Sequence, residues 1–420
     1  MCAEGVWDTV RLDEIAQFRN GVNYNKRNFG AGVKIINVRD FQDHSIASYE
    51  SLDEINPKGV VQQESLLREG DLLFVRSNGN RELIGRSLFV ADPPQGVTHS
   101  AFTIRVRFTS DKALPRFYAY LFRSSLIRQV LSAQGNGTNI SNLNQGILSQ
   151  LKVPLPPLPT QRKIAAILSA YDDLIENNTR RIKILEEMAQ ALYHEWFVHF
   201  RFPGHEGVRL VETELGLVPE GWEIKRLGDV ATVKGGKRLP LGKLVQDKKT
   251  DHPYLRVVDF GERRLDRSAI KYIDDDVHRA INRYIITSDD VYISIAGTIG
   301  RIGLVPEDLS GANLTENAAK ISLIHDRRDK YLLLYHLISS NGQNQIMAKT
   351  GGTSQPKLAL FKIEEIQVVW PPEYLRIQFV KLVAECEKLI EVLDRRVVLL
   401  RRTRDLLLPK LISGDVDVVA

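Results

Sequence analysis

The chain contains two copies of one unit, and the second copy begins about halfway along its 420 residues. Trp7, near the beginning of the first copy, corresponds to Trp222 near the beginning of the second. The letters IGR at 84–86 return at 299–301, at the same separation as the two tryptophans. Solenoid proteins are built from three or more short repeats. Two long copies therefore predict a duplicated globular unit, in which both halves of the chain bury the same apolar pattern.

Further stretches match between the copies in the same order. KIINVRDF at 34–41 recurs as PYLRVVDF at 253–260, and VPLPPLPTQ at 153–161 recurs as VVWPPEYLR at 368–376. The blocks that contain them are rich in short runs of Val, Ile, Phe and Tyr, punctuated by Gly, Asn, Asp and Pro. Such runs predict strands separated by turns. Each copy therefore begins with a strand-rich block.

Helical patterns close each block. One helix is predicted at 115–132 in the first copy and one at 329–347 in the second, and a strand, a proline stop and a long helix follow in each. The predicted fold class is α+β, with two mixed α/β blocks related by a pseudo-two-fold axis and joined by two long antiparallel α-helices. The predicted segments are the first block at 1–155, a central helix at 158–200, a linker at 201–221, the second block at 222–370 and a final helix at 373–412.

The two long helices carry matching apolar stripes. The first has Thr160 as its expected N-cap, and the second is expected to run from Glu373 to Leu408 and to stop at Pro409. At 1.5 Å per residue each is about 55–60 Å long, roughly twice the width of a small domain. We therefore expect the stripes to pack on each other as an antiparallel rod. The alternative is two independent helices, each capping its own block.

The stripes recur at spacings of three and four residues, the period of one helix face. Asn178 interrupts the first stripe and is either a register-setting core residue or a partly exposed one. The residues expected to pack the helix pair are Ile164, Leu168, Tyr171, Ile175, Ile182, Leu185, Leu192, Phe379, Leu382, Cys386, Leu389, Leu393, Val397 and Leu400.

Composition narrows the class of protein. The net charge of +5 is mildly basic and permits nucleic-acid binding without requiring it. No apolar run approaches the roughly 18 residues of a membrane span, and no secretory signal is expected at the beginning of the chain. Cys2 and Cys386 are the only cysteines, which argues against disulfides or a thiolate metal site. We therefore expect a cytoplasmic protein.

Catalytic motifs are missing from the sequence. HEWFVH at 194–199 is one residue too long for the zinc-binding H-E-x-x-H, so His194, Trp196 and His199 are expected to pack at a helix end. The chain has no phosphate-binding G-x-x-x-x-G-K-[ST] loop. We expect no catalytic residue, no metal and no cofactor in this chain.

Four segments carry a family resemblance. They are PLPPLPTQRKIAAILSAYDDLIENN at 154–178, LYHEWFVHF at 192–200, VPEGWEIKRLGDV at 218–230 and LLLPKLISGDV at 406–416. In this order, and with two variable strand-rich blocks, the chain resembles the specificity subunit of type I restriction–modification enzymes over essentially its whole length. The beginning of the second long helix, at 371–390, departs from the usual pattern of that family.

The resemblance implies a function without chemistry in this chain. Each block would be a target recognition domain that reads one half of a bipartite, asymmetric DNA site, and the helix pair would set the gap between the halves. Two methyltransferase subunits, which carry S-adenosylmethionine, would dock on the chain. Two motor-nuclease subunits, which use ATP and Mg²⁺, would complete the assembly.

Polar, basic and glycine-rich loops are the candidate DNA contacts, since such side chains and backbone N–H groups bind bases and phosphates. The alternative for each loop is ordinary solvated turn chemistry. The Gly-Arg pairs at 85–86 and 300–301 recur in both copies and could mark a shared turn. The candidates are Asn23, Tyr24, Lys26, Arg27, Arg76, Asn78, Asn80, Arg81, Arg86, Asn136, Thr138, Asn139, Lys234, Lys237, Arg238, Lys243, Thr298, Arg301, Thr353, Ser354, Gln355 and Lys357.

Two other functions fit parts of the pattern. A pseudo-symmetric scaffold that binds proteins without reading DNA is compatible with the long helices and the mild charge. An enzyme with its own active site is disfavoured by the missing motifs. DNA binding separates the first from a specificity subunit, and incubation of the chain with DNA and S-adenosylmethionine tests the second.

Overall fold

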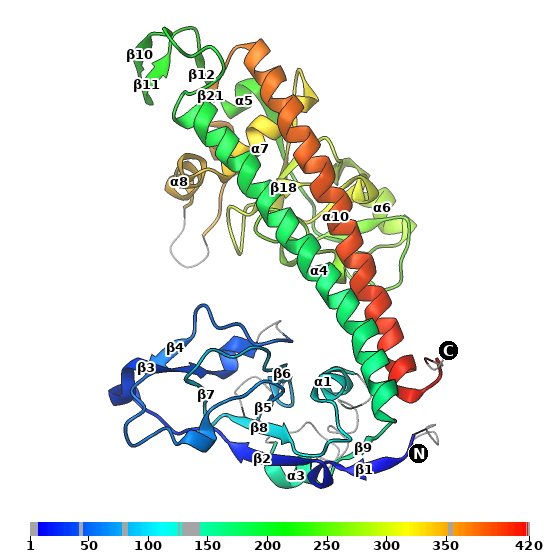
Figure 1. The fold of residues 1–420 in the computed structure, drawn as a ribbon. Coiled ribbons are helices and arrows are strands. Elements are labelled where there is room, and N and C mark those ends of the chain that lie inside the picture. The colour runs from blue at the N-terminus through cyan, green and yellow to red at the C-terminus, as the bar shows by residue number, and fades with distance from the viewer. Residues whose placement is uncertain are drawn as a thin grey trace. The chain divides into compact units, whose positions relative to one another are not determined.

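The computed structural model describes residues 7–41, 45–77, 83–124, 127, 143–351, 356–416 and 418. The chain divides into two compact units (Figure 1). The first comprises Met1–Ile175 with Leu399–Ala420, and the second comprises Glu176–Val398. Each unit therefore holds one strand-rich block and a part of both long helices.

The first unit is built on a four-stranded antiparallel sheet with the order β2-β8-β5-β6. A second sheet has the order β4-β3-β7, in which β3 and β7 are parallel, and β1 pairs with β9. The strands are β1 (Thr9–Arg11), β2 (Ala16–Asn20), β3 (Phe29–Ile36), β4 (Asp53–Ile55), β5 (Leu72–Val75), β6 (Ser87–Phe89), β7 (Val97–His99), β8 (Thr103–Phe108) and β9 (Lys152–Pro154). The helices are η1 (Leu12–Glu14), η2 (Lys26–Asn28), η3 (Val38–Phe41), η4 (Gln63–Ser65), α1 (Pro115–Arg123) and α3 (Gln145–Ser149).

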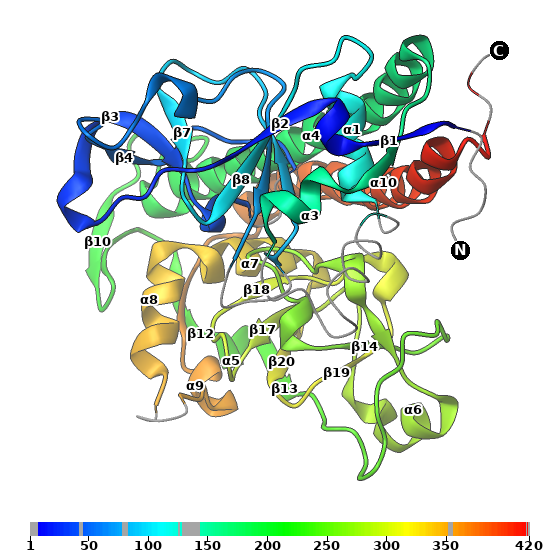
Figure 2. The same cartoon turned by 90° about the horizontal axis from the view of Figure 1, so that it is seen from below.

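The second unit repeats this plan with the sheet order β13-β20-β17-β18 (Figure 2). Its other sheets are β15-β14-β19-β16, with β14 and β19 parallel, the pair β12-β21 and the hairpin β10-β11. The strands are β10 (Leu210–Thr213), β11 (Gly216–Pro219), β12 (Glu223–Arg226), β13 (Ala231–Gly235), β14 (Pro253–Leu255), β15 (Lys271–Tyr272), β16 (Ile285–Ile286), β17 (Val291–Ser294), β18 (Ile302–Leu304), β19 (Ala312–Leu314), β20 (Ala318–Leu323) and β21 (Gln367–Trp370).

The helices of this half are short apart from two. They are α5 (Leu227–Val230), α6 (Asp275–Ile281), α7 (Lys330–Ile338), α8 (Ser340–Lys349), α9 (Leu360–Glu364), the 3₁₀ turns η7 (Val257–Asp259), η8 (Arg267–Ala269), η9 (Asn282–Tyr284), η10 (Glu307–Leu309) and η11 (Arg327–Asp329), and the π-helix η6 (His194–Val198). The long helices are α4 (Leu158–Tyr193) and α10 (Glu373–Ser413), which together take part in both units. In the part of the chain that the structure describes, no helix has the length and apolarity to cross a membrane.

The duplication extends to single backbone hydrogen bonds. Gly21 N–H donates to Thr103 O, and Gly236 N–H donates to Ala318 O at the corresponding position of the second copy. A Cβ added to Gly21 or to Gly236 would lie 2.2 Å from a backbone carbonyl oxygen. Glycine is therefore required at both turns, because the carbonyl oxygens of Ser100 and Thr315, respectively, lie too close for a side chain.

The number of residues between equivalent positions of the two copies changes along the chain. Asp40 accepts from Asn37 N–H at 2.7 Å, and Asp259 accepts from Arg256 N–H at 2.8 Å. These equivalent aspartates lie further apart in the chain than Gly21 and Gly236 do, and the original separation returns by Thr103 and Ala318. The second copy therefore has four additional residues before β14, and the first copy has four additional residues between β5 and β6.

The core of the first unit lies between its main sheet, α1 and the ends of both long helices. Phe74 of β5 packs edge-to-face on Phe122 of α1 with 4.9 Å between ring centroids. The same apolar cluster includes Ile164 of α4 together with Leu408 and Leu411 of α10. The beginning of α4 therefore packs beside the end of α10.

The core of the second unit joins the opposite helix ends. Phe197, just after α4, packs on Phe379 near the beginning of α10 with 4.8 Å between ring centroids, and Trp222 belongs to the same cluster. Beginning beside end in one unit and end beside beginning in the other makes α4 and α10 antiparallel, as predicted (Figure 1). Trp196 is buried there, which confirms helix-end packing, whereas His194 is half-buried and His199 is exposed.

The apolar stripes bury a narrower face than predicted. Leu382 is 51% exposed and Leu389 is 39% exposed, so the expectation that both pack in the helix pair is wrong. Val383 and Ile390, which belong to the same apolar stripe of α10, are buried. One residue turns a helix by about 100°, which carries the two leucines away from that face. Of the other residues predicted to pack the helix pair, the buried ones are Ile164, Leu168, Ile175, Ile182, Phe379, Leu393 and Val397, and the half-buried ones are Tyr171, Leu185, Leu192, Cys386 and Leu400.

The predicted N-cap of α4 and the predicted stop of α10 at Pro409 are both wrong. Leu158 begins α4, so Thr160 is not its N-cap; instead the buried side-chain amide of Gln161 donates to Lys112 O and Pro156 O at 2.8 and 2.7 Å and holds the first turn. The last turns of α10 continue past Pro409 to Ser413 because Leu411 and Ile412 are buried. Asn178 is only 8% exposed, so it is a buried residue and not a partly exposed one.

The single helix predicted at 329–347 is wrong, because α7 and α8 are separated at Ser339. The backbone of Ser339 is extended, and its hydroxyl donates to His336 O at 2.6 Å and caps α8. Ser124 makes the same bond to Leu121 O, so α1 and α7 end in the same way. Beyond Ser124, most of the helix predicted at 115–132 lies outside the described residues.

Candidate nucleic-acid interface

The candidate loop after β2 presents basic side chains from a fixed turn. The side chain of Asn25 accepts from Arg27 N–H at 2.9 Å and caps η2, on which Lys26 and Arg27 are exposed. Tyr24 donates to Asn37 Oδ1 at 2.8 Å and is half-buried. Asn23 beside it is exposed. The turn therefore presents two exposed cations on a capped backbone, and such side chains are suited to phosphate contacts.

Arg76 and Arg86 lie together at one end of the β5–β6 hairpin. Val75 N–H donates to Arg86 O at 2.9 Å, and Arg76 N–H donates to Phe102 O at 2.8 Å. Both arginines are half-buried. The other candidates of this copy, Asn78, Asn80, Arg81, Asn136, Thr138 and Asn139, lie outside the described residues.

Phe102 was not among the predicted residues. It is 61% exposed and lies between β7 and β8, where its carbonyl oxygen accepts from Arg76 N–H. Exposed aromatic rings beside cations are suited to stacking on bases or sugars. The sequence signal, one Phe in SAFTI at 100–104, does not distinguish it from a core residue of a strand.

In the second copy, two candidate cations are paired with carboxylates of their own domain. Arg238 Nε lies 2.7 Å from Glu316 Oε1, and Lys243 Nζ lies 2.5 Å from Asp276 Oδ2. Partial burial acts to raise the pKa of Glu316, but the Arg238 bond and further hydrogen bonds hold it below its ordinary value. The bond from Lys243 lowers the pKa of the Asp276 carboxyl. These pairs fix the loop after β13 and leave its remaining cations exposed.

Lys234 is exposed on β13, and Lys237 lies over the ring of Tyr284 at 5.7 Å from its centroid. This cation–π contact is compatible with simultaneous exposure of the ammonium group. Lys357 is exposed in a short antiparallel bridge with Gly351. The predicted Thr353, Ser354 and Gln355 between them lie outside the described residues.

The side chain of Arg301 is engaged within its own domain. Its Nη1 donates to Phe260 O at 2.9 Å, and its backbone N–H donates to Ser294 Oγ at 2.9 Å. Thr298 is exposed in the same turn, and its carbonyl oxygen accepts from Ser294. Gly85 and Gly300 both have a left-handed φ, of 79° and 83°. The recurring Gly-Arg pair therefore marks a shared backbone turn.

Each block is attached to a long helix through a tyrosine and a carboxylate at matching positions. Tyr120 of α1 donates to Asp172 of α4 at 2.8 Å, and Arg404 of α10 lies 2.6 Å from the same carboxylate. Tyr335 of α7 donates to Glu387 of α10 at 2.5 Å. Burial acts to raise the pKa of Asp172, but its cationic and phenolic partners hold it below the ordinary value. Burial raises the pKa of Glu387.

No metal centre is found in the part of the chain that the structure describes, where no three His, Cys, Asp or Glu side chains converge. His194 and His199 have ring centroids 6.5 Å apart and belong to a helix end. The described residues therefore offer exposed cations on loops and turns, and no metal-binding cluster.

Comparison with known proteins gives one family. Residues 4–187 and 219–378 match the family model described as the type I restriction modification DNA specificity domain. Over 98% of this chain and 94% of its own length, the MjaIX specificity subunit of a Methanocaldococcus jannaschii type I restriction enzyme is 26% identical. The HindI specificity subunit of Haemophilus influenzae is 23% identical over 84% of this chain and 88% of its own.

A solved structure shares the fold. The type I restriction–modification S subunit from M. genitalium superposes with a TM-score of 0.59, at 16% identity, over 98% of this chain and 97% of that one. The two regions matched by the family model correspond to the two copies recognised in the sequence and in the sheet order.

Proposed function

Because the chain belongs to the type I restriction modification DNA specificity family, we propose that each strand-rich block is a target recognition domain for one half of a bipartite, asymmetric DNA site. The observation that carries this proposal is one scaffold with two different sets of loops. The order of the main four-stranded sheet is the same in both copies, whereas the loops differ in length and charge. Two domains with one framework and different loops are suited to binding two different half-sites.

The helix pair would set the distance between the half-sites. α4 has 36 residues and α10 has 41, and both are continuous through the boundary between the units. A helix has a fixed rise of about 1.5 Å per residue, so its length defines a span along the duplex. In this proposal the gap between half-sites follows from helix length and not from base contacts.

Partner subunits would dock on the exposed apolar side chains of the two helices. Large exposed apolar surfaces mark interaction sites. The side chains are Ile167, Leu174, Ile184, Met188, Tyr374, Ile377, Leu382, Leu389, Val392, Leu399 and Leu406. We propose two methyltransferase subunits, which bring S-adenosylmethionine, and two motor-nuclease subunits, which bring ATP and Mg²⁺. This chain would supply the DNA sequence specificity and no catalytic group. The complex would act in the cytoplasm.

Single-molecule methylation mapping tests the proposal. A host that expresses the chain with its methyltransferase subunit should carry adenine methylation at one bipartite sequence with a constant gap. The same host with the methyltransferase alone is the control and should lack that sequence. A methylation pattern that does not depend on the chain contradicts the proposal, and a chain that assembles partners without binding DNA would be a scaffold.

A further inference from the structure

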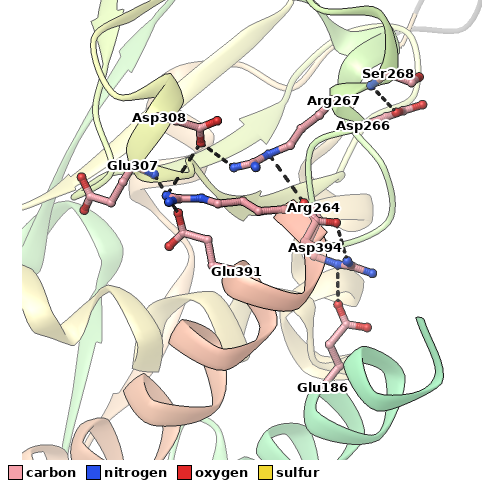
Figure 3. A network of polar contacts seen from close by, with 10 residues as sticks. Glu186, Arg264, Asp266, Arg267, Ser268, Glu307, Asp308, Glu391 and Asp394 are labelled. Atoms are coloured by element: carbon pink, nitrogen blue, oxygen red, sulfur yellow. Dashed lines mark hydrogen bonds and ion pairs between the residues drawn. The ribbon is translucent and has the colours of Figure 1, made fainter. Parts of the chain in front are cut away.

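One loop of the second unit contacts both long helices (Figure 3). Arg264 Nε lies 2.9 Å from Glu186 Oε1 of α4, and its Nη1 lies 3.0 Å from Asp394 Oδ1 of α10. One guanidinium therefore bridges the two helices. The planar fork of arginine holds two carboxylates in fixed directions, which the single ammonium of a lysine does not.

Two neighbouring arginines reinforce this contact. Arg267 Nε lies 3.5 Å from Asp394 Oδ2, and its Nη2 lies 2.6 Å from Asp308 Oδ1. Arg263 donates to the side-chain oxygen of Gln190 on α4. We refer to Arg263, Arg264 and Arg267 as the arginine brace.

The brace is partly withdrawn from solvent. The side chain of Arg267 is 8% exposed, those of Glu186 and Asp394 are 17% and 21% exposed, and that of Arg264 is 37% exposed. Ion pairs with this degree of burial contribute less to net stability than to a defined geometry, because desolvation offsets much of the attraction. Removing the arginines leaves the largely buried carboxylates of Glu186 and Asp394 without these partners, so the variants are expected to lose stability as well as to loosen the position of the loop.

The loop that carries the brace is fixed to its own domain. Gly261 N–H donates to Arg264 O at 2.8 Å, and Asp266 N–H donates to Asp259 O at 2.7 Å. Leu265 is 4% exposed and belongs to the apolar cluster behind β17 and β19. The loop is therefore held to the sheet of its own domain, and through it the arginines connect that sheet to the two helices.

The first copy has different residues at the equivalent positions. Counted from Phe41, which corresponds to Phe260, Arg264 and Arg267 correspond to Ser45 and Ser48. On the helices, Asp394 corresponds to Thr179 and Glu186 to Arg401. A serine is too short to link a domain to two helices, and the acceptor carboxylates are absent from the sequence there. The arginine brace is thus a feature of the second copy.

We propose that the arginine brace consists of positioning residues that hold the second recognition domain at one angle on the helix pair. The second half-site would then be read at a single axial and rotational offset. This proposal rests on the proposed function, because it assumes that the domain reads a half-site. It predicts that the brace controls tolerance for the gap and leaves base recognition unchanged.

The test uses the complex of this chain with its methyltransferase. The double variant Arg264→Ser, Arg267→Ser carries the residues of the first copy. Duplexes with the two half-sites at the natural gap, and at one base pair more or fewer, are methylated side by side. We expect the ratio of methylation at the natural gap to that at the altered gaps to fall about tenfold, equivalent to about 1.4 kcal/mol. Substitution of either half-site should abolish methylation in the variant as in the wild type.

Arg327→Ser is the matched control. It removes one arginine and one exposed ion pair, to Asp289 at 2.7 Å, from the same domain without a link to the helices. The gap ratio of this variant should equal that of the wild type. If the double variant does not assemble, Asp394→Asn removes the charge that Arg264 and Arg267 share, and the same fall in ratio is expected.

A distance measurement separates failure of the inference from failure of the proposed function. Spin labels at Arg279→Cys of α6 and Lys381→Cys of α10, with Cys2→Ser and Cys386→Ser, should give a narrow distance distribution that broadens in the double variant. An unchanged gap ratio and an unchanged distribution overturn the positioning role. If the wild type modifies no bipartite site, the proposed function fails, and the label distances alone then decide for or against the brace.

Discussion

The phenol oxygen of Tyr335 lies 2.5 Å from Oε1 of Glu387, in the place where Tyr120 meets Asp172 in the other copy. The carboxylate of Asp172 also accepts a hydrogen bond from Arg404 Nη1 at 2.6 Å. The two attachments are geometrically alike and electrostatically opposite, because the pKa of Asp172 is lowered and that of Glu387 is raised.

The pKa shift of Glu387 predicts how stability depends on pH. A carboxyl whose pKa is raised by folding favours the folded state in its protonated form, and this contribution is lost as pH rises from the unfolded value of about 4.3 through the folded pKa. The free energy of unfolding of the wild type should therefore fall as pH rises through that window, and in Glu387→Gln this fall should be absent. Thermal unfolding across pH checks this; an identical pH profile in the variant contradicts it.

Asp172→Asn gives the contrasting control for that pair. Folding lowers the pKa of Asp172, so its contribution is present above the unfolded value of about 3.9 and is lost as pH falls through the folded pKa. The variant should be less stable at neutral pH, by about 1.5–3 kcal/mol, because Arg404 loses its bond to the Asp172 carboxylate and keeps only that to Asp405 at 2.8 Å. The difference from wild type should shrink on acidification, as shown by denaturant unfolding at several pH values.

Gly236→Ala should destabilise the second unit, since the new Cβ would lie 2.2 Å from Thr315 O and the backbone must move. We expect a loss of about 1–3 kcal/mol, the range for overpacking. Gly235→Ala is the neighbouring control, because its Cβ would meet only Leu360 at 3.5 Å. Comparable losses in the two variants, measured by denaturant unfolding, would falsify the close-approach explanation.

Lys26→Ala, Arg27→Ala should weaken DNA binding without affecting stability, since both side chains are exposed on η2. If each contacts one phosphate, the slope of log affinity against log salt should decrease by about 1.8. Titration of the complete complex with a duplex at several salt concentrations measures this slope.

Arg301→Ala is the matched arginine for that experiment. Its loss removes the bond to Phe260 O at 2.9 Å, so the melting temperature should fall and the salt slope should stay near the wild-type value. A normal melting temperature together with a reduced slope would assign Arg301 to the DNA and not to the domain.

Inserting four residues at equivalent points of α4 and α10 tests the spacer. Each helix gains about 6 Å, which corresponds to roughly one to two base pairs at 3.4 Å per pair. The methylated sequence should keep both half-sites and gain that gap, as read by methylation mapping. An unchanged gap in a complex that still methylates would exclude helix length as its determinant.

The duplication, the strand-rich blocks and the antiparallel helices were predictable because they rest on repeated local patterns. The break at Ser339 was not predicted, although SSNG at 339–342 combines N-cap and turn residues; in the structure Ser339 caps α8 by accepting from Gly342 N–H. Exposure of Leu382 and Leu389 also depends on which face of the stripe meets the partner helix.

The candidate interface was less predictable than the fold. Loop composition identified exposed cations such as Lys26 and Arg27, but it did not separate them from Arg301, whose side chain binds Phe260 O. That distinction depends on a contact 41 residues away in the chain. The arginine brace has the same origin, because Arg264 meets Glu186 and Asp394 only after folding.

The compensating length changes between the copies have a consequence for how such chains diversify. Because four residues gained before β14 are balanced by four lost between β17 and β18, the strands return to common alignment without a shift of the hydrogen-bond ladder. Loops of altered length can thus be exchanged between a constant pair of frameworks, and new sequence preferences can arise while the frameworks stay the same.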